Sequence, residues 1–215
     1  MTAYSPPKAP LAIVHLDETM IVLDKPAGLL SVPGRGEDKD DCLIHRAQAE
    51  FPEALIVHRL DMGTSGLLVL ARGPAMQRAL SITFQDRCVS KRYVALVAGH
   101  PAEDEGEVAL PLICDWPNRP RQRVDFELGK PSLTRYRVLA READTSRVEL
   151  EPVTGRSHQL RVHLQQLGHP ILGDDLYAPE AIRARSPRLM LHAQGLELPH
   201  PLSGKPMSFE SGPPF

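Results

Sequence analysis

The chain has few cysteines, no long apolar run and little net charge, and each of these features excludes some classes of protein. Its three cysteines, Cys42, Cys88 and Cys114, are odd in number and far apart. We therefore expect neither a disulfide scaffold nor a structural zinc site, and we expect a reducing cytoplasm as the location. No apolar run approaches the roughly 20 residues that span a bilayer. The first ten residues also lack the basic and apolar regions of a signal peptide, so we expect no membrane association.

Motifs for cofactors and for nucleophilic hydrolysis are also lacking. The segment Gly34-Arg35-Gly36 has neither the Lys-Ser/Thr of a phosphate-binding loop nor the third glycine of a dinucleotide site. No GxSxG elbow is present, and Cys88 is interpreted as an inert thiol. His158 and His163 are five residues apart and thus on different faces of a helix, which favours a structural or RNA-contacting role. We predict no metal site and no cofactor.

The small net charge conceals an uneven distribution of charges along the chain. The 25 basic and 27 acidic side chains give a formal net charge of −2. Acidic residues gather in 37–41 and 103–107, whereas 119–137 is rich in cations, namely Arg119, Arg121, Arg123, Lys130, Arg135 and Arg137. Such a segment is either a set of solvated loops or a surface for a polyanion, and the charges alone leave both open.

The hydrophobic pattern predicts many short strands and few helices. In the first half we expect a hairpin around 17–19 that ends at the turn 25–28, a helix over 41–50, a buried strand over 67–71 and a helix from Pro74. In the second half we expect strands over 93–97, 134–139, 147–150 and 189–193, and a terminal hairpin around 203–204. Leu160, Leu164 and Leu167 predict one further helix, which Gly168 ends. These elements indicate an α+β fold in one continuous unit, with helices on a mixed, mainly antiparallel sheet.

The segment 58–68, HRLDMGTSGLL, is the first candidate for chemistry. It places Asp61 on a loop just before a buried strand, with a flexible turn, Thr64-Ser65-Gly66, between them. An acid there is held in place while it stays accessible. The alternative is that Asp61 caps a turn and that Arg59 is an ordinary surface cation.

The segment 150–163 is the second candidate, because it runs from a strand end through a turn into a helix. If Leu160 and Leu164 face the core, Arg161 lies about 100° around the helix, toward its flank. An arginine at that position can bind a neighbouring carboxylate with two hydrogen bonds and keep it ionised.

The chain contains, in this order, the motifs KPAG, HRLDMGTSGLLVLA, KRYVALVAG, TGRSHQLRVHLQQLGHPILGDDLYA and RLMLHA. Together they resemble the RluA family of pseudouridine synthases, from about residue 11 to the C-terminus. The resemblance implies the α+β sheet of that family with a central active-site cleft. It also implies an N-terminal tail over 1–10, a catalytic domain over 11–215 and no separate S4 RNA-binding domain.

The implied activity is the isomerisation of uridine to pseudouridine in structured RNA, without a cofactor. The compact length and the segment PLICDWPNRPRQRV look most like the RluA branch, whose members modify a hairpin of 23S rRNA and the anticodon stem-loop of certain tRNAs. We expect RNA and not DNA as the partner, and a monomer. Two alternatives stay open: the same reaction at another single site, such as a tRNA acceptor-stem uridine, or a non-catalytic RNA-binding or chaperone protein.

The resemblance also assigns roles to individual residues. Asp61 matches the catalytic aspartate, Tyr93 the tyrosine that lies against the target base, and Arg161 the basic partner of the aspartate. For Tyr93 the alternative is a strand residue that fills the core. Further substrate contacts are predicted for Leu191, an apolar residue of the pocket, and for five basic or ionisable residues: His58, Arg59, Arg119, Arg121 and Arg123.

Overall fold

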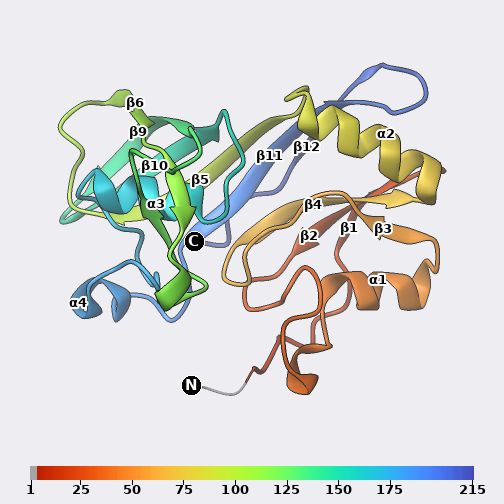
Figure 1. Cartoon of the computed structure of the whole chain (residues 1–215), viewed down its shortest axis with the longest axis horizontal. Coiled ribbons are helices and arrows are strands. Elements are labelled where there is room, and N and C mark those ends of the chain that lie inside the picture. Colours follow the sequence, from red (N-terminus) through yellow and green to blue (C-terminus); the bar gives the residue numbers. More distant parts are fainter. Residues whose placement is uncertain (1–3) are drawn as a thin grey trace. The chain divides into compact units, whose positions relative to one another are not determined.

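The computed structural model describes residues 4–215, and its contacts divide the chain into two compact units (Figure 1). Unit 1 comprises Met1–Lys91 and Ala193–Pro214, of which the first three residues lie outside the description. Unit 2 comprises Arg92–His192 and Phe215. The predicted division into a tail over 1–10 and one catalytic domain over 11–215 stays a prediction.

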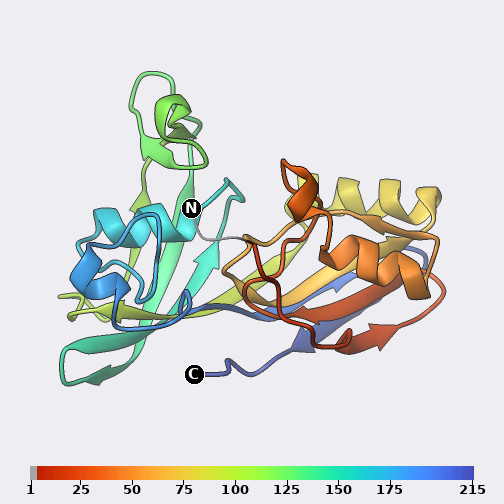
Figure 2. The ribbon, with the colours of Figure 1, turned by 90° about the horizontal axis from the view of Figure 1, so that it is seen from below.

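Unit 1 is a sheet with two helices on it. Four of its strands follow the order β1-β2-β4-β11, β3 pairs with β4, and β12 pairs with β11. The bounds are β1 Ile13–Leu16, β2 Met20–Lys25, β3 Ala54–Ile56, β4 Ser65–Arg72, β11 Leu191–Pro199 and β12 Pro206–Glu210. The helices α1 (Leu43–Glu50) and α2 (Pro74–Gln85) lie on the same face of this sheet (Figure 2), and a short 3-10 turn, η1, covers Glu37–Lys39. The predicted hairpins, both helices and the buried strand are thereby confirmed.

Each helix of unit 1 buries an apolar face. Leu43, Ile44 and Ala47, which are spaced to share one face of the helix, are the buried residues of α1. In α2, Leu80 is fully buried, and Met76 and Phe84 pack against the same core cluster. Burying one face of each helix on the sheet keeps the segment between β3 and β4, which carries Asp61, on a rigid support.

The expected flexible turn at 64–66 is wrong in part, because the strand begins earlier. Ser65 and Gly66 are the first two residues of β4, and both are buried. Gly66 has a φ of +109°, and a Cβ on it would collide with the backbone of Ala193 in the neighbouring strand β11. The glycine therefore serves the close approach of two strands, and it does not make a turn.

Unit 2 is an antiparallel sheet of order β5-β10-β9-β6 with a separate two-stranded ribbon, β7-β8. The bounds are β5 Ser90–Ala98, β6 Glu105–Ala109, β7 Leu112–Cys114, β8 Gln122–Val124, β9 Leu133–Glu142 and β10 Thr145–Pro152. Its helices are α3 (Gln159–Gln166) and α4 (Glu180–Arg183), and η2 covers Trp116–Asn118. The chain passes between the units within β5 and within β11.

The leucine spacing predicted a helix, and α3 confirms it. Leu160 and Leu164 are buried in the core of unit 2, Leu167 packs against the same cluster, and Gly168 follows with a φ of +90°. The strand pairings with an established register are antiparallel, and an isolated bridge between Leu30 and Cys42 is parallel. The predicted fold class, α+β with a mainly antiparallel sheet, is confirmed, while the predicted central cleft stays a prediction.

Replacing Gly66 with alanine should destabilise the protein, because the new methyl group meets the Ala193 backbone and the φ of +109° disfavours a side chain. We expect the free energy of unfolding to fall by more than about 2 kcal/mol in urea denaturation. The control Gly212→Ala places its methyl group in open space, with nothing within 4 Å. It should change stability by less than about 0.5 kcal/mol, and equal losses for the two variants would contradict the close-approach argument.

Candidate active site

Asp61 lies on the loop that connects β3 to β4, and this loop is held by an earlier segment of unit 1. The residue is partly buried, and its carbonyl accepts a hydrogen bond from the Thr64 amide at 3.1 Å, which closes a turn before β4 begins. The carbonyl of the next residue, Met62, accepts from the Gly28 amide at 2.8 Å. The structure therefore places this acid, as expected, on a supported loop beside a rigid strand.

Lys25 is a second support for the same loop, a role that was not predicted from the sequence. It ends β2 and is fully buried, with an exposed fraction of 0 %. Its ammonium donates to three backbone carbonyls, those of Pro26 at 2.9 Å, Leu29 at 2.7 Å and Met62 at 3.2 Å. A buried cation needs such acceptors. In the sequence, the KPAG motif, which begins with Lys25 and Pro26, was the feature that could have pointed to this residue.

His58 has an environment that gives it a structural role in unit 1. Its ring stacks on Phe84 with centroids 4.4 Å apart, and its Nε2 accepts a hydrogen bond from the Val69 amide at 3.0 Å. Burial, and secondarily the charge of Lys91, lower the pKa of His58 to about 3, so the ring is neutral near pH 7. Arg59, by contrast, is exposed. Substrate contact by His58 or Arg59 stays a prediction.

Arg161 is buried, because α3 is covered on more than its leucine face. Residues 159–164 are all buried, and α3 contacts β8, β9 and β10. Arg161 has an exposed fraction of 4 %. The ribbon β7-β8 packs on Val162, and the loop 174–177 packs on Arg161, so the flank predicted for this arginine is a buried one.

Asp174 is the acid that orients the Arg161 guanidinium within unit 2. Nε and Nη2 of Arg161 donate to its two carboxylate oxygens at 2.9 and 2.6 Å, and Nη2 also donates to Asp175 at 2.8 Å. Asp174 is itself fully buried and accepts the backbone amides of Leu176 and Tyr177. The expected bidentate binding of a carboxylate is therefore present, although the sequence analysis did not single out Asp174.

Tyr177 and His158 complete this cluster at the start of α3. The guanidinium of Arg161 lies 5.2 Å from the Tyr177 ring centroid. The Tyr177 hydroxyl is 2.7 Å from His158 Nδ1 and accepts the Gln122 amide at 2.8 Å. His158 has a left-handed backbone with a φ of +54°, which non-glycine residues seldom adopt. The contact with Tyr177 helps to hold His158 in this backbone conformation.

Tyr93 and Leu191 belong to the core of unit 2. Tyr93 is partly buried in β5, opposite Leu150 of β10, and packs against the main apolar cluster of the unit. Leu191 begins β11 and has an exposed fraction of 3 % in the same cluster. His163, fully buried with Thr134, Ser132 and Leu110 as hydrogen-bond partners, has the structural role considered for it, and burial lowers its pKa.

Part of the cation-rich segment 119–137 lies beside acidic residues, because Arg135 and Arg137 are in a sheet with glutamates. Strand β6 contains part of the acidic segment 103–107 and pairs with β9, so Glu107 lies opposite Arg135. Arg135 forms ion pairs with Glu107 at 2.9 Å and Glu151 at 3.7 Å, and Arg137 pairs with Glu149 at 2.8 Å. Sheet pairing thus places charges side by side that are far apart along the chain.

The ribbon β7-β8 carries the three arginines predicted to bind substrate, and it extends from the main sheet of unit 2 (Figure 2). Arg119 stacks on the Trp116 ring at 4.4 Å, and Trp116 is 64 % exposed. Arg121 donates to the Leu176 carbonyl, and Arg123 pairs with Asp125 at 2.8 Å. Two of the three therefore already have protein acceptors, while Arg119 presents an exposed pair with an aromatic ring.

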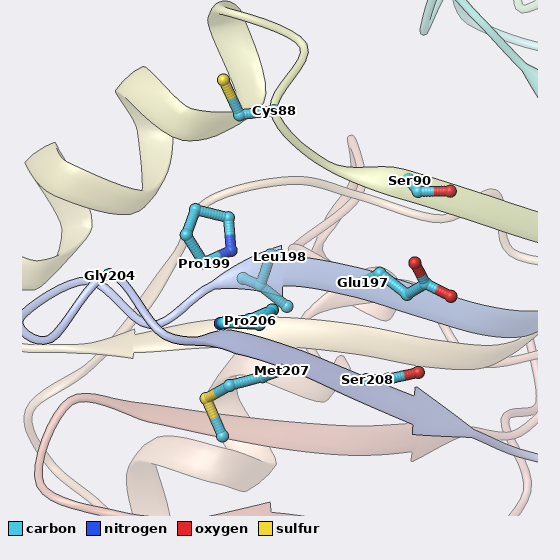
Figure 3. Close-up of a pocket in the computed structure, with 9 residues that line it drawn as sticks. All are labelled: Cys88, Ser90, Glu197, Leu198, Pro199, Gly204, Pro206, Met207 and Ser208. Carbon is cyan, nitrogen blue, oxygen red and sulfur yellow. The ribbon is translucent and has the colours of Figure 1, made fainter.

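A pocket of about 340 Å³ lies within unit 1 (Figure 3). Its lining comes from the loop after α2, the start of β5, and β11 and β12 with the turn between them. It comprises Cys88, Ser90, Glu197, Leu198, Pro199, Gly204, Pro206, Met207 and Ser208. None of the predicted site residues is among these, so this pocket is distinct from the predicted active site.

Two absences hold for the described residues, 4–215. Within that range no cluster of three or more histidine, cysteine, aspartate or glutamate side chains is arranged to hold a metal ion. None of the helices described there has both the length and the apolar character to cross a membrane.

Comparison with known sequences identifies the family. Residues 19–166 match the sequence model of a family described as RNA pseudouridylate synthase. The chain is 52% identical to the dual-specificity RNA pseudouridine synthase RluA of Escherichia coli K12, and the match covers 100% of this chain and 99% of that protein. The enzyme of the same name from Salmonella typhi is 54% identical, with 98% and 97% covered, and that from Pasteurella multocida is 51% identical, with 100% and 99% covered.

Solved structures give the same result. Human RNA pseudouridylate synthase domain containing 1 is similar with a TM-score of 0.82 at 31% identity, and the match covers 98% of this chain and 87% of that one. Human RNA pseudouridylate synthase domain containing 4 has a TM-score of 0.75 at 28% identity, with 94% and 88% covered. Because the motifs, the family match, the similarity to solved structures and near-complete coverage at about half identity agree, the chain belongs to the RluA family of RNA pseudouridine synthases.

Proposed function

We propose that this enzyme isomerises uridines in two structured RNAs, a hairpin of 23S rRNA and the anticodon stem-loop of certain tRNAs. The observation that carries the proposal is 52% identity over the whole chain to an enzyme named for dual specificity toward RNA. The RluA branch, which the segment PLICDWPNRPRQRV resembles, has this pair of substrates. We further propose that the enzyme acts as a monomer in the cytoplasm.

The reaction requires one ionised carboxylate, and we assign it to Asp61. The N1–C1′ bond of uridine breaks, the detached uracil turns, and a C5–C1′ bond forms, while the C5 hydrogen leaves as a proton and N1 takes up a proton, so that the product is an isomer of uridine. The carboxylate either attacks the sugar or the base, or removes a sugar proton during elimination. Asp61 lies on a loop in which Lys25 and Gly28 bind the carbonyl of the next residue, Met62. This supports the assignment, because a reacting group must be kept in a narrow range of positions.

Arg161 is proposed as the basic partner that keeps the Asp61 carboxylate ionised. Its guanidinium is planar and oriented by the buried Asp174, so it is presented as a fixed cation. A lysine at this position would lose the planar fork that Asp174 binds. Leu191 is proposed to close the apolar wall of the base site.

Tyr93 and Arg59 are proposed to handle the target nucleotide. A base in a helix must be flipped out before it reacts, which costs a few kcal/mol. The aromatic ring of Tyr93 can stack on the detached uracil, at roughly 1–3 kcal/mol per base. Arg59 is exposed and two residues before Asp61, so its guanidinium is suited to fill the space that the flipped base leaves.

The substrate proposal is tested by mapping pseudouridines in RNA from a strain that lacks this gene, with carbodiimide modification and primer extension. We expect one site in a 23S rRNA hairpin and one in a tRNA anticodon loop to be lost, and both to return with the wild-type gene. Loss at a single site, for example in an acceptor stem, would support the single-site alternative. If no site is lost, the proposal is wrong.

The assignment of Asp61 predicts that Asp61→Asn abolishes tritium release from RNA that contains 5-tritiated uridine, with a rate at least about 10³-fold below wild type. The variant should keep its affinity for the RNA to within a few fold. The control Asp86→Asn changes an exposed acid at the end of α2 and should leave the rate unchanged. A wild-type protein that binds RNA without releasing tritium would instead indicate the non-catalytic alternative.

The ion pairs of the cation-rich segment predict which arginines bind the RNA backbone. Arg119→Gln should weaken binding of an anticodon stem-loop and lower the slope of log affinity against log salt by about 0.7 to 0.9, because one phosphate contact is lost. Arg135→Gln, whose guanidinium is already paired with Glu107 and Glu151, should change that slope much less. Equal slopes for the two variants in filter-binding titrations would count against the role of Arg119.

A further inference from the structure

We propose that Ser31 is a positioning residue for Asp61, an inference that rests on the proposed catalytic role of Asp61. Ser31 follows β2 on the chain and has an exposed fraction of 3 %. Its hydroxyl donates to the Leu60 carbonyl at 2.7 Å and accepts from the Leu60 amide at 3.1 Å. One side chain thereby binds both backbone polar groups of the residue immediately before Asp61.

A hydroxyl is the group that this arrangement requires. It supplies one donor and two acceptor lone pairs, so it can bind an amide and a carbonyl of the same residue at once. Leu60 is itself buried, with an exposed fraction of 7 %. Without the hydroxyl, its amide and carbonyl would lose their partner in a buried place, and the loop would have to shift to satisfy them.

Ser31 acts on one side of Asp61, and Lys25 and Gly28 act on the other. They bind the carbonyl of Met62, the residue immediately after Asp61. The loop is thus held at both neighbours of the reacting residue by one segment, residues 25–31. The Ser31 carbonyl also accepts the Ile44 amide at 3.3 Å, which connects this segment to α1. Displacements of about 1 Å in a reacting group cost up to about a hundredfold in rate, so these contacts matter for turnover.

Ser146 provides a matched control for the loss of a buried hydroxyl. It is fully buried in β10, and its hydroxyl donates to the Gly99 carbonyl at 2.9 Å and bonds to His100 Nδ1 at 3.0 Å. Neither partner is adjacent in sequence to a proposed site residue. Ser146→Ala therefore removes a comparable set of hydrogen bonds without touching the Asp61 loop.

The test compares full-length Ser31→Ala, Ser31→Thr and Ser146→Ala with wild type in single-turnover tritium release from a 5-tritiated anticodon stem-loop RNA. Each protein is assayed well below its unfolding temperature. We expect Ser31→Ala to lower the rate at saturating RNA by about 10- to 100-fold while its RNA dissociation constant changes by less than about twofold. Ser31→Thr keeps the hydroxyl and should retain most of the rate, and Ser146→Ala should retain the wild-type rate. A rate for Ser31→Ala equal to that of Ser146→Ala would overturn the inference.

A measurement on the wild-type protein keeps the inference testable if Ser31→Ala does not fold. The Leu60 amide should exchange its hydrogen as slowly as the core amides of β4, because the Ser31 hydroxyl holds it. Fast hydrogen exchange at the Leu60 amide would refute the proposed hold of Ser31 on the backbone of Leu60. Asp61→Asn distinguishes the two roles: if it retains activity, the proposed catalytic role of Asp61 fails, and the role of Ser31 fails with it. If it is inactive while Ser31→Ala is not impaired, only the role of Ser31 fails.

Discussion

Polar groups that leave water must find partners inside the protein, and this constraint builds the candidate site. Lys25 and Arg161 are long cationic side chains that are almost fully buried, and each is bound by acceptors, backbone carbonyls for Lys25 and carboxylates for Arg161. Within residues 4–215, no buried side-chain nitrogen or oxygen lacks a hydrogen-bond partner. Because each such contact has a narrow geometry, satisfying these groups also determines where the neighbouring loops lie.

This arrangement favours a defined geometry over maximal stability. A buried ion pair such as Arg161–Asp174 often contributes less to stability than apolar residues of the same volume would, because both ions lose their hydration. Its value here is the orientation of the guanidinium plane, which Asp174 determines through two hydrogen bonds. The same logic applies to Lys25, whose ammonium joins the turn after β2 to the loop that carries Asp61. Asp174 thus orients Arg161, and Lys25 holds the loop of Asp61, so each supports a residue that is proposed to take part in the reaction.

On the surface of unit 2, the pairing of the strands determines which exposed charges lie next to each other. Arg135 and Arg137 look like part of a basic stretch in the sequence, but neighbouring strands of unit 2 place glutamates beside them. Such exposed pairs contribute little to stability, yet they reduce the number of arginines that are available to a polyanion. The exposed pair of Arg119 with Trp116 on the β7-β8 ribbon is then the better candidate for RNA contact.

Much of the fold could be predicted from the sequence, because the relevant signals are local. The spacing of Leu160 and Leu164 predicted α3, the two β-rich runs on either side of 17–19 predicted a hairpin, and the order of the motifs predicted the family, all of which are confirmed. The positions of Asp61, before a buried strand, and Tyr93, within a strand, were also predicted from local pattern.

What only the tertiary structure decided are the contacts between distant segments. The amino-acid order contains no signal that Asp174 binds Arg161, that Ser31 binds both backbone groups of Leu60, or that Glu107 lies beside Arg135. Gly66 looked like part of a turn because the strand that approaches it is more than a hundred residues away along the chain. Periodicity reports which face of an element is apolar, whereas the partner of a buried charge, hydroxyl or glycine depends on which other element covers that face. That choice is made by the packing of the whole chain.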